Sequence, residues 1–163
     1  MSYSKVIALL IGGAAFLYGA AFSATPAAAA ACSLDLSKMK ARVITGTTTV
    51  QTTSFTQVQA PGLSATFTQG SAGCVFIQLA ADVATPTDQE ILMRVELDGS
   101  STGGTPTTVF FTSRTADQFA ANSANFIFAS VPAGAHTVRI VWSSFQSGVV
   151  KMTGRSLTVY YPS

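Results

Sequence analysis

Apolar and polar residues alternate with a period of two along most of this chain, and no stretch after the first 31 residues keeps a helical period. Successive side chains of a β-strand point to opposite faces, so this alternation predicts strands that bury one face. The clearest case is the segment 91–98. Ile91, Met93, Val95 and Leu97 stand at odd positions and are expected to face inward, whereas Arg94, Glu96 and Asp98 stand at even positions and are expected to face solvent.

Several further segments show the same pattern. Segment 74–80 is apolar on both faces, which predicts a central strand, and the threonine-rich segment 42–55 predicts one or two more. Segment 117–124 leaves room for one helical turn. The remaining inward positions predicted from the alternation are Leu63, Ala65 and Phe67; Val109 and Phe111; Phe126 and Phe128; His136, Val138, Ile140 and Trp142; and Leu157, Val159 and Tyr161.

Turn sequences separate these segments at short and regular intervals. Val131-Pro-Ala-Gly134, for example, has proline and glycine where a type I turn favours them. About eight to ten strands at this spacing predict an all-β protein, an antiparallel β-sandwich of jelly-roll type. No linker or internal repeat divides residues 32–163, which are therefore expected to form a single domain.

The first 31 residues have the three parts of a signal peptide. Lys5 supplies a positive start, residues 6–22 are apolar and uncharged, and residues 27–31 are all alanine. We expect a helical signal peptide over residues 1–31, cleaved before Cys32, although a cut one or three residues earlier fits nearly as well. An uncleaved anchor is the alternative, but the apolar run is short of the roughly 20 residues that a spanning helix needs. The expected location is secreted or periplasmic.

The chain has two cysteines, Cys32 and Cys74. In an oxidising compartment, an even pair without metal-ligand spacing predicts one disulfide. The bond would close residues 32–74 into a loop, and the chain-entropy relation gives it about 4 kcal/mol of stabilisation. Two alternatives remain. Cys74 can be a small buried apolar residue with Cys32 free, or Cys32 can carry a lipid after cleavage, which would make the protein a lipoprotein.

Charged residues make up only 10% of the chain, and the net charge is +2. The usual charged share of a globular protein is about a quarter. Serine and threonine occupy most polar positions instead, and no basic stripe of the kind that binds nucleic acid is present. A hydroxyl-rich surface of low charge is typical of exported β-proteins, and it is also compatible with packing against copies of the same chain.

The C-terminal part resembles a known kind of domain. The stretch Val131-Pro-Ala-Gly-Ala-His-Thr-Val-Arg-Ile-Val-Trp142, then Gly148, then Arg155-Ser-Leu-Thr-Val159 resembles the end of small bacterial secreted domains related to the tumour-necrosis-factor and complement globular-head jelly rolls. The aromatic and glycine signatures of the complement heads are absent, so no ligand site carries over. The resemblance implies a jelly roll whose last strand returns to the middle of one sheet, and it is compatible with a homotrimer.

Few residues suggest catalysis. The single histidine, His136, could serve a Ser-His-Asp triad, but no Gly-x-Ser-x-Gly elbow exists and its phase predicts a hydrogen-bonded strand-end residue. Glu96 and Asp98 would lie roughly 7 Å apart on one strand face and could mimic an inverting hydrolase pair. A solvated face is the simpler interpretation. The loop after Asp98 has no second carboxylate for calcium. We expect no catalytic residue, cofactor or metal.

Three basic residues, Lys38, Lys40 and Arg42, follow one another at period two near the start of the domain. On a strand they would form one basic edge. Such an edge could contact an acidic envelope polymer or anionic lipid. The interpretation we favour is that it protects an exposed strand against pairing with another chain.

Aromatic residues suggest one possible ligand surface. Tyr160 and Tyr161, with Trp142, could form a sugar-stacking platform, although the phase of Trp142 favours the core. We therefore expect an exported, non-enzymatic β-sandwich with a structural, adhesive or ligand-binding role at the cell envelope or outside the cell. The alternatives are a carbohydrate-binding module and a hydrolase with an unrecognised site. Expected partners are copies of the chain and a glycan or envelope polymer, with no nucleic acid. Membrane contact would occur only through the leader or a lipidated Cys32.

Overall fold

A computed structural model describes residues 32, 38–86, 89–113, 115–146 and 148–163. The expected signal peptide, residues 1–31, lies outside these residues. The described residues form ten strands and no α-helix. Within this part of the chain there is accordingly no helix long and apolar enough to span a membrane.

The strands follow the alternation of the sequence closely. Segment 117–124 is an exception, because the expected helical turn is replaced by the start of β8 at Ala120. The polar loop after Asp98 contains a short strand, β6, that the sequence pattern does not show. In chain order the strands are β1 (Met39–Gly46), β2 (Val50–Thr52), β3 (Val58–Gln69), β4 (Gly73–Ala84), β5 (Ile91–Leu97), β6 (Gly104–Thr105), β7 (Val109–Phe111), β8 (Ala120–Val131), β9 (Gly134–Ser144) and β10 (Val150–Pro162).

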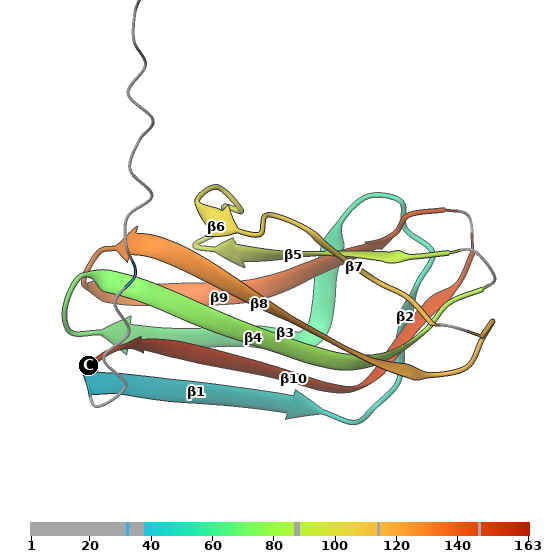
Figure 1. The fold of residues 1–163 in the computed structure, drawn as a ribbon, viewed down its shortest axis with the longest axis horizontal. Coiled ribbons are helices and arrows are strands. Elements are labelled where there is room, and N and C mark those ends of the chain that lie inside the picture. Colours follow the sequence, from blue (N-terminus) through green and yellow to red (C-terminus); the bar gives the residue numbers. More distant parts are fainter. Residues whose placement is uncertain (1–31, 33–37, 87–88, 114, 147) are drawn as a thin grey trace, which may run out of the picture.

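Two antiparallel sheets pack face to face as a sandwich (Figure 1). One has the order β1-β10-β4-β8-β6, with β2 also paired to β10, and the other has the order β3-β9-β5-β7. Early strands pair with late strands in nested fashion: β1 with β10, β3 with β9, β4 with β8 and β5 with β7. A long hairpin rolled up on itself has this connectivity, so the prediction of a jelly-roll sandwich is confirmed.

Side chains from the inner faces of both sheets form one core. The phase predicted from the sequence is confirmed for β9, where His136, Val138, Ile140 and Trp142 are all buried. It also holds in β5, where Ile91 and Met93 are fully buried. Trp142 is 1% exposed and is the largest of the fully buried side chains. Trp142 therefore belongs to the core and is not part of the sugar-stacking platform considered above.

The last strand, β10, lies between β1 and β4 in the larger sheet. It is one strand, interrupted by a bulge between Thr153 and Ser156. Gly154 adopts a positive φ of 49° there. The bulge turns Arg155 toward the interior, where its Nε donates to the carbonyl of Pro61 at 3.0 Å and its Nη1 donates to the carbonyl of Thr48. Arg155 is only 6% exposed.

A disulfide joins Cys32 to Cys74, the second residue of β4, with a Cα–Cα distance of 5.6 Å. The predicted pairing of the two cysteines is thus present in the structure. Both sulfur atoms are used in the bond, so this form leaves no thiol on Cys32 for a lipid. The bond fastens the beginning of the domain to a strand in the middle of the larger sheet.

The edge strand β1 carries two of the three basic residues considered above. Lys40 and Arg42 stand opposite Tyr161 and Val159 of β10, so their side chains leave β1 on the core-facing side, and both are exposed. Charges at inward positions of an edge strand discourage a further strand from adding there. The third residue, Lys38, lies just before the strand, and its carbonyl accepts a hydrogen bond from the Ser163 amide.

Candidate functional site

A groove lies on the outer face of the smaller sheet and has a volume of about 540 Å³. Three segments far apart in the sequence build it: the stretch before β3, the first half of β5, and the end of β9 with the residue that follows. We call it the phenylalanine groove. Its lining residues are Phe55, Thr56, Gln57, Leu92, Arg94, Ser143, Ser144 and Phe145.

The floor of the phenylalanine groove follows from strand register. Ile91 and Met93 point into the core, so Leu92 between them points outward. Leu92 stands opposite Ser143 of β9 on one side and Phe110 of β7 on the other. An apolar side chain at an outward position thus lies at the centre of the floor.

Backbone hydrogen bonds hold the two walls in place. The Ser144 amide donates to the carbonyl of Ser54 at 2.8 Å, which ties the segment before β3 to the end of β9. The Phe145 amide donates to the carbonyl of Glu90 at 3.0 Å, which ties the other wall to the start of β5. The groove is therefore formed by the folded chain itself and does not depend on a ligand.

Three phenylalanine rings surround this floor and remain open to solvent. Phe55 is 63% exposed, Phe145 is 55% exposed and Phe110 is 50% exposed. The rings of Phe110 and Phe145 meet edge to face with centroids 5.6 Å apart. Exposed apolar side chains gathered around one depression mark a binding surface more often than scattered ones do.

Arg94 is the one charged residue that lines the groove within the described chain. Arg94 uses its Nε to donate to the Thr108 hydroxyl at 2.9 Å, and among the described residues no carboxylate pairs with it. The side-chain nitrogen Nε2 of Gln57 is buried and meets no acceptor in the same part of the chain. The groove therefore favours a ligand that places a negative charge opposite Arg94.

The nearest carboxylate along β5 does not neutralise Arg94. Glu96, two residues further on the same face, forms an ion pair with Arg139 of β9, its neighbour in register. Its side chain is 18% exposed, against 42% for that of Arg139. The charge of Glu96 is thus balanced across the strand pair, and that of Arg94 is left facing the groove.

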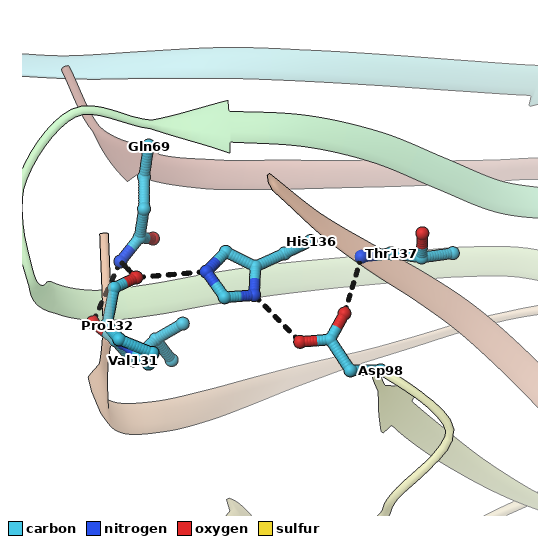
Figure 2. A network of polar contacts seen from close by, with 6 residues as sticks. All are labelled: Gln69, Asp98, Val131, Pro132, His136 and Thr137. Atoms are coloured by element: carbon cyan, nitrogen blue, oxygen red, sulfur yellow. Dashed lines mark hydrogen bonds and ion pairs between the residues drawn. The ribbon is translucent and has the colours of Figure 1, made fainter. Parts of the chain in front are cut away.

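A second polar cluster surrounds His136 at the opposite end of β9 (Figure 2). The ring Nδ1 lies 2.7 Å from Oδ2 of Asp98, and Nε2 lies 2.9 Å from the carbonyl oxygen of Pro132. Asp98 also accepts a hydrogen bond from the Thr137 amide at 2.8 Å. Gln69 donates to the same Pro132 carbonyl and to that of Val131.

Both ring nitrogens of His136 therefore face oxygen acceptors, an arrangement that suits the doubly protonated imidazolium. The hydrogen bond to Asp98 raises the pKa of His136 above its ordinary value, although burial opposes the rise. Burial raises the pKa of Asp98, but the hydrogen bonds from His136 and from the Thr137 amide outweigh it and lower that pKa overall. A general base needs a nitrogen with a free lone pair, and His136 has none while both bonds are intact.

The proposed pairing of Glu96 with Asp98 is not observed. β5 ends at Leu97, and Asp98 adopts a positive φ of 52° in the following turn. The two carboxylates consequently do not continue one strand face, and each contacts its own cation, Arg139 or His136. Among the described residues, no three His, Cys, Asp or Glu side chains gather as a metal site would require.

The two C-terminal tyrosines lie on opposite faces of β10. Tyr161 continues the buried phase and packs on Phe67, with ring centroids 4.6 Å apart. Tyr160 lies on the outer face of the larger sheet beside Phe76, with centroids 5.8 Å apart. The structure thus does not bring the two rings together as one platform.

Sequence reasoning missed the phenylalanine groove, although a signal was present. Leu92 and Phe110 are apolar at positions where the alternation predicts polar residues. What the alternation could not show is that these positions are neighbours in register.

No protein-family model matches the chain, and no curated protein matches it.

Proposed function

We propose that this chain is an exported, non-enzymatic β-sandwich that binds a ligand through the phenylalanine groove, in an adhesive or structural role at the cell envelope or outside the cell. The observation that carries the proposal is the combination of three exposed phenylalanine rings with an arginine that has no carboxylate partner in the described chain. The volume falls in the range of about 300–1,000 Å³ that is common for small-ligand sites.

Export is supported by two independent features. Residues 1–31 have the sequence pattern of a signal peptide. The Cys32–Cys74 disulfide is compatible with an oxidising compartment, where such bonds persist. Together they favour a secreted or periplasmic protein, and the disulfide favours this form over one in which Cys32 carries a lipid.

The binding role is tested with 8-anilinonaphthalene-1-sulfonate, a fluorescent probe that combines aromatic rings with one negative charge. The native exported protein is expected to enhance its fluorescence, since the probe offers rings to Phe55 and Phe145 and an anion to Arg94. The double variant Phe55→Ser/Phe145→Ser is expected to lose most of the enhancement. Phe119→Ser is the matched control, because Phe119 is also an exposed phenylalanine, 47%, but does not line the groove.

Two outcomes would contradict the binding role. One is equal fluorescence enhancement by the native protein and by the double variant. The other is a loss in the Phe119→Ser control as large as that in the double variant, because the probe would then report general surface hydrophobicity.

Self-association is a second candidate, favoured by the outer face of the larger sheet. Three successive cross-strand rows of this face, the third of them next to the bulge of β10, contain no charged residue. Charge depletion of this kind is typical of the centre of an interface between subunits. The rows are Ala41, Tyr160, Phe76 and Ile127; Val43, Thr158, Gln78 and Asn125; and Thr45, Ser156, Ala80 and Ser123.

Light scattering on the native exported protein tests this candidate. We expect an oligomer, with three copies as the state compatible with the resemblance noted above, and we expect Ile127→Lys to shift it toward the monomer. Thr66→Lys, on the outer face of the other sheet, is the matched control and should leave the oligomer unchanged. A strict monomer at high protein concentration would exclude the candidate.

A further inference from the structure

The chemistry of the phenylalanine groove narrows the class of its ligand, on the premise that the groove is the binding site proposed above. The first constraint comes from its donors. Arg94 presents N–H groups and a positive charge, and the Thr56 and Ser143 side chains add hydroxyls to the lining. A purely apolar ligand would cover the guanidinium of Arg94 without offering it an acceptor, which is unfavourable.

The second constraint is the geometry left to Arg94. Its Nε is anchored to Thr108, so the guanidinium presents its two terminal amino groups. A pair of parallel N–H donors matches the two oxygens of a carboxylate, which is the bidentate arrangement that arginine favours. The favoured anion is therefore a planar carboxylate.

The third constraint is the open aromatic rim. Phe55 and Phe145 are more than half exposed on the two walls, which leaves ring faces available above the donors. A pyranose ring has a C–H face that can cover such a ring and hydroxyl oxygens that can accept from donors below. A sugar acid combines all three requirements in one unit: an apolar face, several acceptors and a carboxylate.

We propose that the phenylalanine groove binds a hexuronate unit of an acidic polysaccharide, with the sugar carboxylate on Arg94 and the sugar ring against Phe55 or Phe145. A peptide that ends in an aromatic residue shares the carboxylate and the apolar part. It lacks the hydroxyl groups that a pyranose offers to the polar side chains of the lining, so the observations favour the sugar acid.

Isothermal titration of the native exported protein with a galacturonate trisaccharide tests the proposal. The same trisaccharide with its carboxylates methyl-esterified is the matched ligand, since it keeps the rings and loses the charge. We expect the acid to bind at least tenfold more tightly than the ester. Loss of a charge-assisted bond of about 1.5–3 kcal/mol corresponds to a factor of about 10 to 150.

Two variants locate the effect. Arg94→Gln is expected to weaken binding of the acid to the level of the ester and to leave binding of the ester unchanged. Arg42→Gln is the matched control, because Arg42 is an exposed arginine on β1, outside the groove, and should leave both affinities unchanged. Circular dichroism of each variant checks that the fold is retained.

Three results would overturn the proposal. Equal affinity for acid and ester would show that the carboxylate is not recognised, and an unchanged affinity of Arg94→Gln for the acid would show that Arg94 does not recognise it. Tighter binding of N-acetyl-Gly-Phe with a free carboxylate would assign the groove to a peptide terminus. In each case the fluorescent probe reports separately on whether the groove binds at all, so failure of the sugar acid is distinguishable from failure of the binding role.

Discussion

His136 makes the stability of this fold depend on pH. Its protonated ring bridges Asp98 and the Pro132 carbonyl, and its pKa is raised by the bond to Asp98. Between the unfolded pKa of about 6.5 and the higher folded value, the folded chain keeps a proton that the unfolded chain has lost. Stability supplied by the pair is therefore complete below about pH 6.5 and is lost as the pH rises through the folded pKa.

The carboxylate of the pair acts in the opposite direction. The pKa of Asp98 is lowered in the folded chain, so its contribution is present above about pH 4 and is lost as the pH falls through the lowered value. We expect urea unfolding between pH 4 and 9 to show the greatest stability from about pH 4 to 6.5. Asp98→Asn should cost about 1 kcal/mol in that range, a modest figure because Asp98 is half exposed.

The shape of the pH profile separates this pair from other titrating groups. Asp98→Asn keeps an acceptor for the Thr137 amide and removes the charge, so the decline in stability above pH 6.5 should flatten. A decline that persists undiminished in Asp98→Asn would show that another group causes it.

Arg155 is a buried cation that donates hydrogen bonds to two carbonyl oxygens. Arg155→Met keeps an apolar stem but leaves the carbonyls of Thr48 and Pro61 without their donor. We expect Arg155→Met to lower the free energy of unfolding, measured by urea titration, by about 2 kcal/mol. Arg155→Lys should lower it by less, because one ammonium group can still donate to one of the two carbonyls but does not reach both. Arg139→Met is the control.

The control follows from exposure. Arg139 is 42% exposed and its ion pair with Glu96 is accessible to water, so its removal should cost less than about 1 kcal/mol. Equal losses for the Arg155 and Arg139 variants would show that the carbonyl contacts of Arg155 do not stabilise the fold.

At the scale of the elements, β10 depends on its bulge. Gly154 has a positive φ of 49°, and a Cβ there would collide with Oδ2 of Asp82 on the neighbouring strand. We expect Gly154→Ala to lower the free energy of unfolding by about 2 kcal/mol, from backbone strain and the collision together. Gly99→Ala is the control for strain alone, because Gly99 has a φ of 82° and no atom within 4 Å of an added Cβ.

The comparison of the two glycines gives a clear criterion. Gly99→Ala should cost about 1 kcal/mol, and the excess in Gly154→Ala should shrink when Asp82→Ala is combined with it. If the two glycine variants lose the same free energy, the contact between β10 and β4 at the bulge does not constrain this position.

The strands also show which structural features can be predicted from the sequence. Alternation identified the buried side of β5 and β9 residue by residue, because inward phase depends only on the local period of two. It left the partners of outward residues open: Leu92 and Phe110 become neighbours only through the pairing of β5 with β7. The bond between Asp98 and His136 was missed for a related reason, since Asp98 was expected to continue a strand that in fact ends at Leu97.

For the whole molecule, the jelly roll brings the two ends of the described chain close together. The Ser163 amide donates to the carbonyl of Lys38, just before β1, and the Cys32–Cys74 bond attaches Cys32 to β4. In Figure 1 the C-terminus lies beside the start of β1. Strand number and turn spacing predict the fold class, a jelly-roll sandwich, but not which strands pair. The register between distant strands is a property of the assembled sheets.

The disulfide is expected to carry a large share of the stability of this assembly. Cross-linking residues 32 and 74 restricts the unfolded chain, and the chain-entropy relation gives about 4 kcal/mol for a loop of this length. The disulfide-bonded protein should therefore lose about that much free energy of unfolding when a reductant is added during urea titration. The Cys32→Ser/Cys74→Ser variant should have the lower free energy of unfolding from the start, and the reductant should not change it.

Intact mass of the protein recovered from the cell envelope or medium completes this experiment, because it also tests the fate of the leader. Cleavage before Cys32 with the bond formed gives the mass of residues 32–163 less two hydrogen atoms. A lipid on Cys32 would instead add the mass of acyl chains and would remove the sulfur that the bond needs. The mass and the response to reductant must therefore agree. A mass increased by acyl chains, found together with a stability that the reductant lowers, would contradict the expectation that cleavage before Cys32 is followed by formation of the Cys32–Cys74 bond.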